Sequence, residues 1–460
     1  MGKKEDEKII LELLENKDLL HLTKRIIDTV KYSKLSKKGN FIANEYAEKV
    51  LEDFELVYDE FGRLWMYDEE SGIWLENAEK DLDTILRARY LEEKYQKKYF
   101  VEEVIAQIKA RVFGRGIFCE PDLNLIPFND KIYDLNKDKL LSYSKKYFFT
   151  SKLPASIDIK VAKCPTIDRI FKELLGDDNC YVLYQIAAYC LYRAYPLQQA
   201  FFLVGDGRNG KSTFINILER FLGEENVSSV SLWGLEHNNF YISQLYGKLL
   251  NNCGELDENV FNNTSVLKQL TGGDLIVANK KFKEPFKFRN YAKILITTNK
   301  IPQTNDKSAG FYRRSRIIEF PYKFDYGQNA VAAIEKTIPS SEYDGFAVKC
   351  LQVLKDLKKE GFMLKGHKTI EQAAKEYEDA SNPLSLYLKE NVLKDSSGKI
   401  SCTKLANLFN GYIEEKNLPI WSSIKISKEM KDKGYEMKTL SVKKDGQATT
   451  KKFWIGLKWK

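Results

Sequence analysis

Histidine and closely spaced cysteine are scarce in this sequence. The 460-residue chain has only three histidines, His21, His237 and His367, and its seven cysteines include no C-x-x-C pair. Zinc domains and histidine-dependent nicking nucleases place their ligands at short, regular spacings, and no such spacing occurs here. The sequence therefore argues against both classes. Scattered cysteines are also typical of proteins in a reducing compartment, which predicts a cytoplasmic location.

Long hydrophobic runs are missing as well. The longest apolar region, residues 181–204, is interrupted by Gln185, Arg193 and Pro196. A membrane-spanning helix needs about 20 consecutive, mostly apolar residues, so this region predicts a buried helix and a strand. The N-terminus is rich in Lys and Glu and lacks a signal-peptide pattern. We therefore expect no membrane partner.

The whole chain has a net formal charge of +8, but most of its length is nearly balanced. Residues 421–460 contain eleven lysines and four acidic residues, which gives this short segment a net charge of +7. A basic C-terminal module on a nearly neutral body suggests a polyanionic partner, although a solvated Lys-rich surface has the same composition. The length predicts two to four domains.

The strongest local signal is the stretch Phe201–Thr213, which matches the phosphate-loop pattern G-x-x-x-x-G-K-[ST]. An apolar strand, Ala200–Val204, precedes the loop, and an amphipathic helix, Ser212–Phe221, follows it. Glycines let backbone N–H groups approach phosphate oxygens, and the helix N-terminus adds positive potential. The pattern predicts a nucleotide and magnesium site formed by Gly205, Asp206, Gly207, Arg208, Asn209, Gly210, Lys211, Ser212 and Thr213.

Two further apolar stretches predict core strands beside this loop. Lys248–Cys253 is followed by acidic residues, of which Glu255 is our first candidate for holding magnesium or activating water, and Asp257 the second. Surface-loop acids are the alternative interpretation. Lys293–Asn299 ends in an amide that can orient a water against a γ-phosphate, although Asn also ends many strands for local reasons.

A basic hairpin and an arginine pair follow. Leu275–Asn279 and Phe286–Phe288 predict hairpin arms, with Lys280, Lys281, Phe282 and Lys283 near the tip. Lysines around an aromatic ring suit contact with a nucleic-acid backbone, although a plain basic turn has the same pattern. Arg313 and Arg314 precede a strand, where either is a candidate arginine finger or an ordinary surface charge.

In this order, the motifs resemble those of the superfamily III helicases, specifically the phage and plasmid primase-helicase family with its poxvirus relatives. The resemblance covers roughly Leu51–Lys323. Residues before the phosphate loop resemble the family's helical domain, so we expect the helicase portion without the primase domain. The matching blocks are Gly205–Thr213, Glu255, Leu267–Asp274, Glu284–Phe288, Ile296–Pro302 and Gly310–Phe320.

The resemblance implies an AAA+ type P-loop ATPase core that assembles as a ring, with a hexamer expected. It implies that Lys211 and Ser212 bind ATP and Mg²⁺, that Glu255 is the second acidic element, and that Asn299 is the polar sensor. Arg313 or Arg314 would act on the ATP of the neighbouring subunit, and the hairpin would grip one DNA strand. The family often pairs its acids at the strand end, so the choice between Glu255 and Asp257 stays open.

The expected fold class is α/β, with a parallel-sheet ATPase core between a mostly helical α+β domain and a winged-helix-like domain. The predicted domains are residues 1–195, the core at 196–325, a helical connector at 326–380, and the C-terminal domain at 381–460. Three helical patterns and a hairpin turn at Lys443–Gly446 support the last domain. Lys443 and Lys444 would contact duplex DNA. A small α+β packing domain is the alternative.

The leading functional hypothesis is an ATP-dependent DNA helicase of a virus, phage or mobile element, acting inside the host cell during replication. Its expected partners are single-stranded and duplex DNA, further copies of itself, and a separate primase or polymerase. The alternative is an origin-binding initiator ATPase without processive unwinding. A small-molecule P-loop kinase would leave the hairpin and the basic C-terminus without a role.

Overall fold

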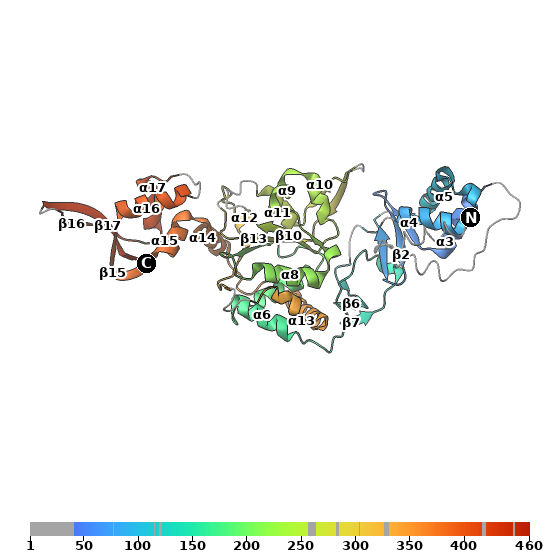
Figure 1. Ribbon diagram of the computed structural model, residues 1–460, viewed down its shortest axis with the longest axis horizontal. Coiled ribbons are helices and arrows are strands. Elements are labelled where there is room, and N and C mark those ends of the chain that lie inside the picture. The colour runs from blue at the N-terminus through green and yellow to red at the C-terminus, as the bar shows by residue number, and fades with distance from the viewer. Residues whose placement is uncertain are drawn as a thin grey trace.

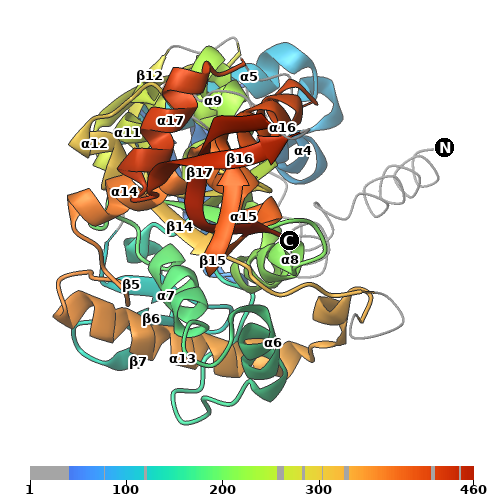
Figure 2. The ribbon, with the colours of Figure 1, turned by 90° about the vertical axis from the view of Figure 1, so that its left-hand side faces the viewer.

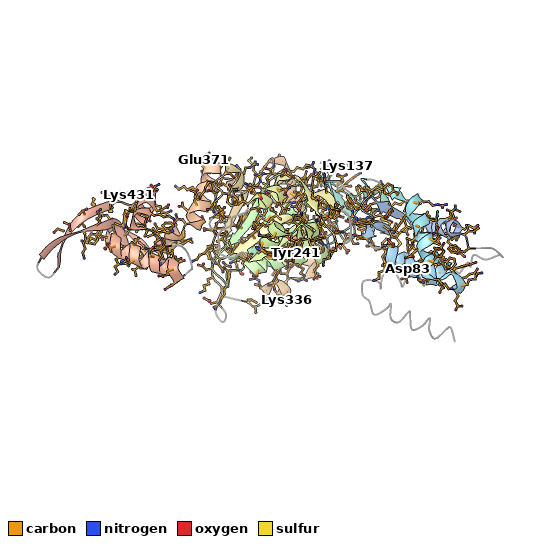
Figure 3. All side chains as sticks on the ribbon, turned by 90° about the horizontal axis from the view of Figure 1, so that it is seen from above. Asp83, Lys137, Tyr241, Lys336, Glu371 and Lys431 are labelled. Carbon is orange, nitrogen blue, oxygen red and sulfur yellow. The ribbon has the colours of Figure 1, made fainter. Side chains whose placement is uncertain are left out.

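A computed structural model describes residues 41–76, 78–114, 116–118, 122–255, 264–281, 285–302, 304–325, 331–415, 420–444 and 447–460. Figure 1 shows three bodies along the long axis, with the N-terminal body in blue and the C-terminal body in red. Figure 3 shows the same order from above, with Asp83, Tyr241 and Lys431 marking the three bodies. Within these ranges, no helix is both long and apolar enough to cross a bilayer.

The N-terminal body combines a small sheet with helices. Its sheet has the strand order β3-β2-β1-β4. Helix α5 buries Val101, Val104, Ile105 and Ile108, whose spacing puts them on one face, in a core shared with α3, α4 and the sheet. The elements are α3 (Ala43–Asp53), β1 (Leu56–Asp59), β2 (Leu64–Asp68), β3 (Ile73–Glu76), α4 (Ala78–Ile85), α5 (Lys98–Arg111) and β4 (Phe113–Gly114). A three-stranded sheet follows, with β5 (Leu125–Pro127), β6 (Ile132–Asp134) and β7 (Lys139–Leu141).

The central body is built on a five-stranded parallel sheet with the order β14-β8-β13-β10-β9. The strands are β8 (Ala200–Val204), β9 (Val227–Ser228), β10 (Leu250–Glu255), β13 (Lys293–Thr298) and β14 (Ser315–Glu319). The predicted strand Ala200–Val204 is confirmed, and it lies between β13 and β14. Its continuous apolar run reflects burial on both faces, which is the usual state of a parallel sheet.

Helices cover both faces of this sheet (Figure 1). One face carries α6 (Pro165–Leu175), α7 (Tyr181–Cys190), α8 (Lys211–Leu222) and α13 (Ser340–Lys359), all of which pack in one core. The other carries α9 (Leu232–His237), α10 (Asn239–Ile242), α11 (Ser265–Gly272), α12 (Ala309–Tyr312) and the hairpin β11 (Leu275–Ala278) and β12 (Phe286–Arg289). Because side chains alternate along β8, Phe201 and Leu203 join the first core and Phe202 joins the second.

The C-terminal body contains helices and an antiparallel sheet with the order β15-β17-β16, which faces the viewer in Figure 2. Its elements are α15 (Pro383–Asn391), β15 (Val392–Ser401), α16 (Cys402–Glu415), α17 (Ser423–Asp432), β16 (Met437–Lys444) and β17 (Gln447–Trp459). Helix α14 (Ile370–Ser381) precedes them and packs on the central body, where Tyr377 joins the second core. The hairpin predicted around the turn at Lys443–Gly446 is confirmed by the pairing of β16 with β17. Strand β15 was not predicted from the sequence.

Candidate nucleotide site and nucleic-acid interface

The loop between β8 and α8 requires glycine at two positions for reasons internal to the chain. A Cβ on Gly205 would lie 1.8 Å from Asn209 Nδ2, and a Cβ on Gly210 would lie 2.1 Å from Leu174 Cδ2. Gly210 also has a φ of 83°, in the left-handed region that favours glycine. A Cβ on Gly207 would meet nothing within 4 Å, so packing within the chain leaves that side of the loop open.

Lys211 lies over the loop at the first turn of α8. The residue is 9% exposed, and its Nζ donates to the Gly205 carbonyl and, at 3.1 Å, to Asn209 Oδ1. The loop is fixed from outside as well, because the Phe324 N–H donates to the Arg208 carbonyl at 2.7 Å and Arg208 pairs with Asp325 at 3.2 Å. A preformed loop at a helix N-terminus, with a buried lysine above it, suits a phosphate group.

The loop borders a cavity of about 740 Å³, within the usual range for a small-molecule site. Loop residues from Gly207 to Thr213 line one side, together with Asn299 at the end of β13. The other lining residues include apolar side chains that suit contact with a base: Ile170, Leu174, Phe324 and Ile334. The structure therefore brings Asn299 to the predicted loop, because β13 and β8 are parallel neighbours whose carboxyl ends meet at one edge.

Several lining residues were not predicted from the sequence, among them Glu219, Asn252 and Thr297. Asn252 Nδ2 donates to Glu219 Oε1 at 3.1 Å, and Asn252 Oδ1 accepts from the Gly254 N–H at 3.1 Å. This amide thus joins the end of β10 to α8. The signal in the sequence was the pair Asn251-Asn252 inside an otherwise apolar strand, since a buried amide needs a partner.

Glu255, the first acidic candidate, is the last residue of β10. The backbone of Glu255 is in register with Thr297 after an irregularity between Asn252 and Glu255, so it lies at the cavity's edge. Asp257 lies outside the described residues, and the choice between the two acids stays open. In the described part of the chain, no three His, Cys, Asp or Glu side chains converge as a metal site. Mg²⁺ commonly takes one or two protein ligands plus phosphates and water, so Ser212 and one acid are a fitting donor set.

The arginines before β14 differ in their surroundings. Arg314 Nη1 donates to the Gly310 carbonyl at 2.8 Å and its Nη2 to Gln198 Oε1 at 3.4 Å. Burial, together with the nearby Arg313 charge, lowers the pKa of Arg314. Arg316 donates to the Gly366 and Lys365 carbonyls. Arg313 is exposed. Of the two candidates, Arg314 is therefore the one held by bonds within its own chain, and Arg313 the exposed one.

The predicted basic hairpin is confirmed as a pair of antiparallel strands, with Leu275 opposite Arg289 and Ala278 opposite Phe286. Phe286 and Phe288 are buried on one face. Lys280 Nζ lies 3.6 Å from the Glu76 carboxylate of β3, and Lys281 is exposed. Phe282 and Lys283 lie outside the described residues. Lys443 and Lys444 occupy the end of β16, opposite Ala448 and Gln447; the structure does not describe their side chains.

Two family models match parts of the chain. Residues 203–314 match a family of unknown function, DUF5906, and residues 55–177 match the family described as D5 N terminal like. A protein of Acanthamoeba polyphaga mimivirus, named as a putative helicase, is 25% identical over an alignment of 276 residues, which covers 53% of this chain. This chain is similar to part of that viral protein. The matched region spans 28% of the length of that relative.

Solved structures of the NrS-1 C-terminal region also match. An apo structure in the A form has a TM-score of 0.48 and 14% sequence identity, covering 91% of this chain and all of that one. A second apo structure of the same region has a TM-score of 0.46 and 15% identity, at the same coverage.

Proposed function

We propose that this chain is an ATP-dependent DNA helicase of a virus, phage or mobile element, which unwinds DNA as a ring during replication. The observation that carries the proposal is the cavity in which the phosphate loop and Asn299 meet at one edge of a parallel sheet. The similarity to a viral helicase supports the same reading. We assign the core to the AAA+ class of superfamily III because the strand before the phosphate loop, β8, lies between β13 and β14, and the polar residue Asn299 follows β13.

In the proposed reaction, the loop residues and Lys211 bind the phosphates of ATP, and Ser212 with Glu255 or Asp257 holds Mg²⁺. Asn299 orients the attacking water, so the protein supplies positioning and charge stabilisation. Arg313 contacts the γ-phosphate held by the neighbouring subunit. Its exposure and the internal contacts of Arg314 favour this assignment. A nucleotide between two subunits would couple hydrolysis to movement of one subunit against the next.

Two surfaces are proposed to bind DNA. The hairpin tip, Lys280–Lys283, would grip one strand inside the ring, and the C-terminal body would bind duplex through Lys443 and Lys444. The C-terminal body has the order α15, β15, α16, α17, β16, β17, which is the order of a winged helix with its wing at the β16–β17 turn. We retain the domain limits 1–195, 196–325, 326–380 and 381–460 as part of this proposal.

The variant Lys211→Ala tests the proposal. We expect it to lose ATP hydrolysis and strand displacement on a forked substrate, because the loop loses the charge that meets the phosphates. Lys359→Ala, which removes an exposed lysine at the end of α13, is the control. Near-normal hydrolysis by Lys211→Ala would refute the assignment. ATP hydrolysis without strand displacement by the unaltered protein would favour the initiator ATPase instead.

A further inference from the structure

A second cavity, of about 260 Å³, lies between the segment 117–151 and the central body. Three cationic side chains line it: Lys146, Arg193 and Arg289. Lys146 and Arg289 are exposed, whereas Arg193 is 9% exposed. The cavity is separate from the nucleotide site, since the two share no lining residue.

Arg193 is the unusual member of this group. Its Nη1 donates to the Leu125 carbonyl at 3.3 Å, and its guanidinium lies 5.5 Å from the centroid of the Phe149 ring. Burial lowers the pKa of Arg193, with the Tyr291 hydroxyl acting in the opposite direction. Among the described lining residues the one carboxylate is that of Asp122, which is exposed and accepts from the Asn124 N–H at 2.8 Å. A buried cation is costly unless an anion compensates it, so the lining favours an anionic ligand.

The walls of the cavity are aromatic and rigid. Phe118, Tyr147, Phe148, Tyr246, Phe288 and Tyr291 contribute to them. Phe148 has a φ of 50°, in the left-handed region that aromatic residues rarely adopt. Its ring stacks on Trp74 with centroids 5.4 Å apart and meets Phe118 edge-on at 5.7 Å. These contacts hold the strained turn in place, so the cavity is preformed.

Aromatic faces beside cationic groups are the features that bind a nucleotide: rings stack on the base, and the cations attract the phosphate. The position of the cavity also suits contact with a DNA strand held by the hairpin. Phe288 and Arg289 belong to β12, so the cavity lies at the root of the hairpin whose tip carries Lys280 and Lys281. We propose that this cavity is a subsite for one nucleotide of single-stranded DNA, whose base contacts the aromatic wall and whose phosphate faces Lys146, Arg193 and Arg289.

This inference rests on the proposed function, because the strand that enters the subsite is the one that the hairpin grips. The experiment uses the full chain and a series of oligo-dT probes, each carrying 5-iodouracil at a single position. Irradiation should crosslink one position of the series to the peptide that contains Tyr147 or to the one that contains Tyr291. Neighbouring positions should crosslink elsewhere, because a single base fits the cavity.

Three variants on the same turn sharpen the experiment. Lys146→Ala should reduce the crosslink and lower the slope of log affinity against log salt by about 0.7, the contribution of one phosphate contact on a single strand. Lys145→Ala removes the same charge one residue away, from a side chain that pairs with Glu55 and does not line the cavity. This control should keep both the crosslink and the slope. Tyr147→Ala should weaken strand binding roughly 5- to 100-fold through lost stacking.

The outcomes separate the subsite from the wider function. Lys211-dependent ATPase with strand displacement, but with no probe position crosslinked to the cavity, would overturn the subsite alone. Equal loss in Lys145→Ala and Lys146→Ala would also overturn it. If 5-iodo-dUMP labels the cavity as efficiently as the oligonucleotide does, the site binds free nucleotides and the strand assignment is wrong. Absence of both ATPase and strand displacement would refute the proposed function, and the subsite with it.

Discussion

Arg313 and Arg314 are adjacent in sequence, but their side chains have different surroundings. Arg314 bonds to Gly310 and Gln198 of its own chain, whereas Arg313 is exposed. We therefore expect Arg313→Ala to bind ATP but to lose hydrolysis by roughly three to five decades, as for a trans arginine finger. Arg314→Ala should act mainly by lowering the melting temperature.

Subunit mixing tests whether Arg313 acts on a neighbour. Combining Arg313→Ala with Lys211→Ala should restore part of the ATPase, because some interfaces then join an intact loop to an intact arginine. The measurement is the hydrolysis rate at several mixing ratios, with co-assembly verified by mass. A mixed assembly that stays inactive would place the arginine within its own subunit's site.

Lys293, at the start of β13, is fully buried and predicts a pH-dependent stability. Its Nζ donates to the carbonyls of Tyr192, Ala194 and Tyr291 at 2.5, 3.0 and 2.7 Å. Burial lowers the pKa of Lys293 to about 7. The unfolded chain thus binds one more proton than the folded chain between pH 7 and the ordinary lysine pKa, so stability should rise with pH across that window.

The free energy of unfolding should rise by about 1–2 kcal/mol between pH 6.5 and 8.5. The three carbonyls limit the effect, because they accept from the ammonium and offset part of the cost of burying it. Urea unfolding at several pH values measures it, with Lys293→Met as the comparison. The difference in unfolding free energy between the two proteins should change with pH in this direction. A constant difference would assign the titration to other groups.

The sequence predicted which residues share a cavity where each follows an apolar strand, and it missed residues that the order of the strands brings together; the roles of these residues stay predictions. The loop and Asn299 were predicted because each follows an apolar strand in a recognisable pattern, and the structure brings them to one cavity. Glu219 and Asn252 are 33 residues apart, and their hydrogen bond exists because β10 lies over α8 in this particular sheet. No local pattern in the sequence encodes that pairing.

At the scale of elements, the basic hairpin is supported by the N-terminal body. Phe61, in the β1–β2 turn, meets Phe286 edge-on at 5.6 Å between ring centroids. Tyr246 contacts Phe286 and Phe288 at 5.3 and 5.5 Å, and its hydroxyl accepts from Arg63 at 3.2 Å. Arg63 is itself paired with the buried Asp59 at 2.6 Å. The β1–β2 turn therefore positions β12 at the end nearest the hairpin tip.

Phe61→Ala should loosen the hairpin without unfolding the N-terminal body. An aromatic pair contributes about 0.5–1.5 kcal/mol, so amides in residues 275–289 should exchange roughly 2- to 10-fold faster. Phe54→Ala is the control, since Phe54 packs in the N-terminal core and belongs to neither hairpin contact. Hydrogen exchange followed by mass spectrometry makes the measurement. Equal acceleration in both variants would show a general destabilisation rather than a specific support.

Strands were predictable where their own residues, or the turn between them, show a typical pattern. The apolar run of β8 and the turn signal between β16 and β17 both gave correct strands. β15 was missed because its centre reads Asp-Ser-Ser-Gly, a sequence typical of a loop. It is a strand because β17 pairs with both of its ends, across an irregularity between Lys394 and Lys399. That pairing partner lies more than 50 residues away, beyond the reach of a local pattern.

At the scale of the whole molecule, one short segment joins the nucleotide cavity to the C-terminal body. Asn299 lines the cavity, and the next residue, Lys300, donates to Glu390 Oε1 of α15 at 3.0 Å and to the Tyr412 hydroxyl of α16 at 3.1 Å. Further along, the Pro302 carbonyl accepts from the Tyr377 hydroxyl of α14 at 3.0 Å. The segment from Asn299 towards Arg313 is thus held by α14, α15 and α16.

This arrangement predicts that duplex DNA on the C-terminal body alters ATP hydrolysis through Lys300. In Lys300→Met, the change in ATPase rate on adding duplex should shrink by up to about 5-fold, since a partly exposed ion pair contributes about 0.2–1 kcal/mol. Duplex affinity itself should stay the same, because Lys300 lies outside the proposed wing.

Lys307→Met is the matched control, as Lys307 pairs with Glu378 of α14 from the same segment. Glu390→Gln should reproduce the Lys300→Met effect, and the double variant should add nothing further. A duplex response that is unchanged in Lys300→Met, or equally reduced in Lys307→Met, would exclude Lys300 as the specific link between the C-terminal body and the nucleotide site.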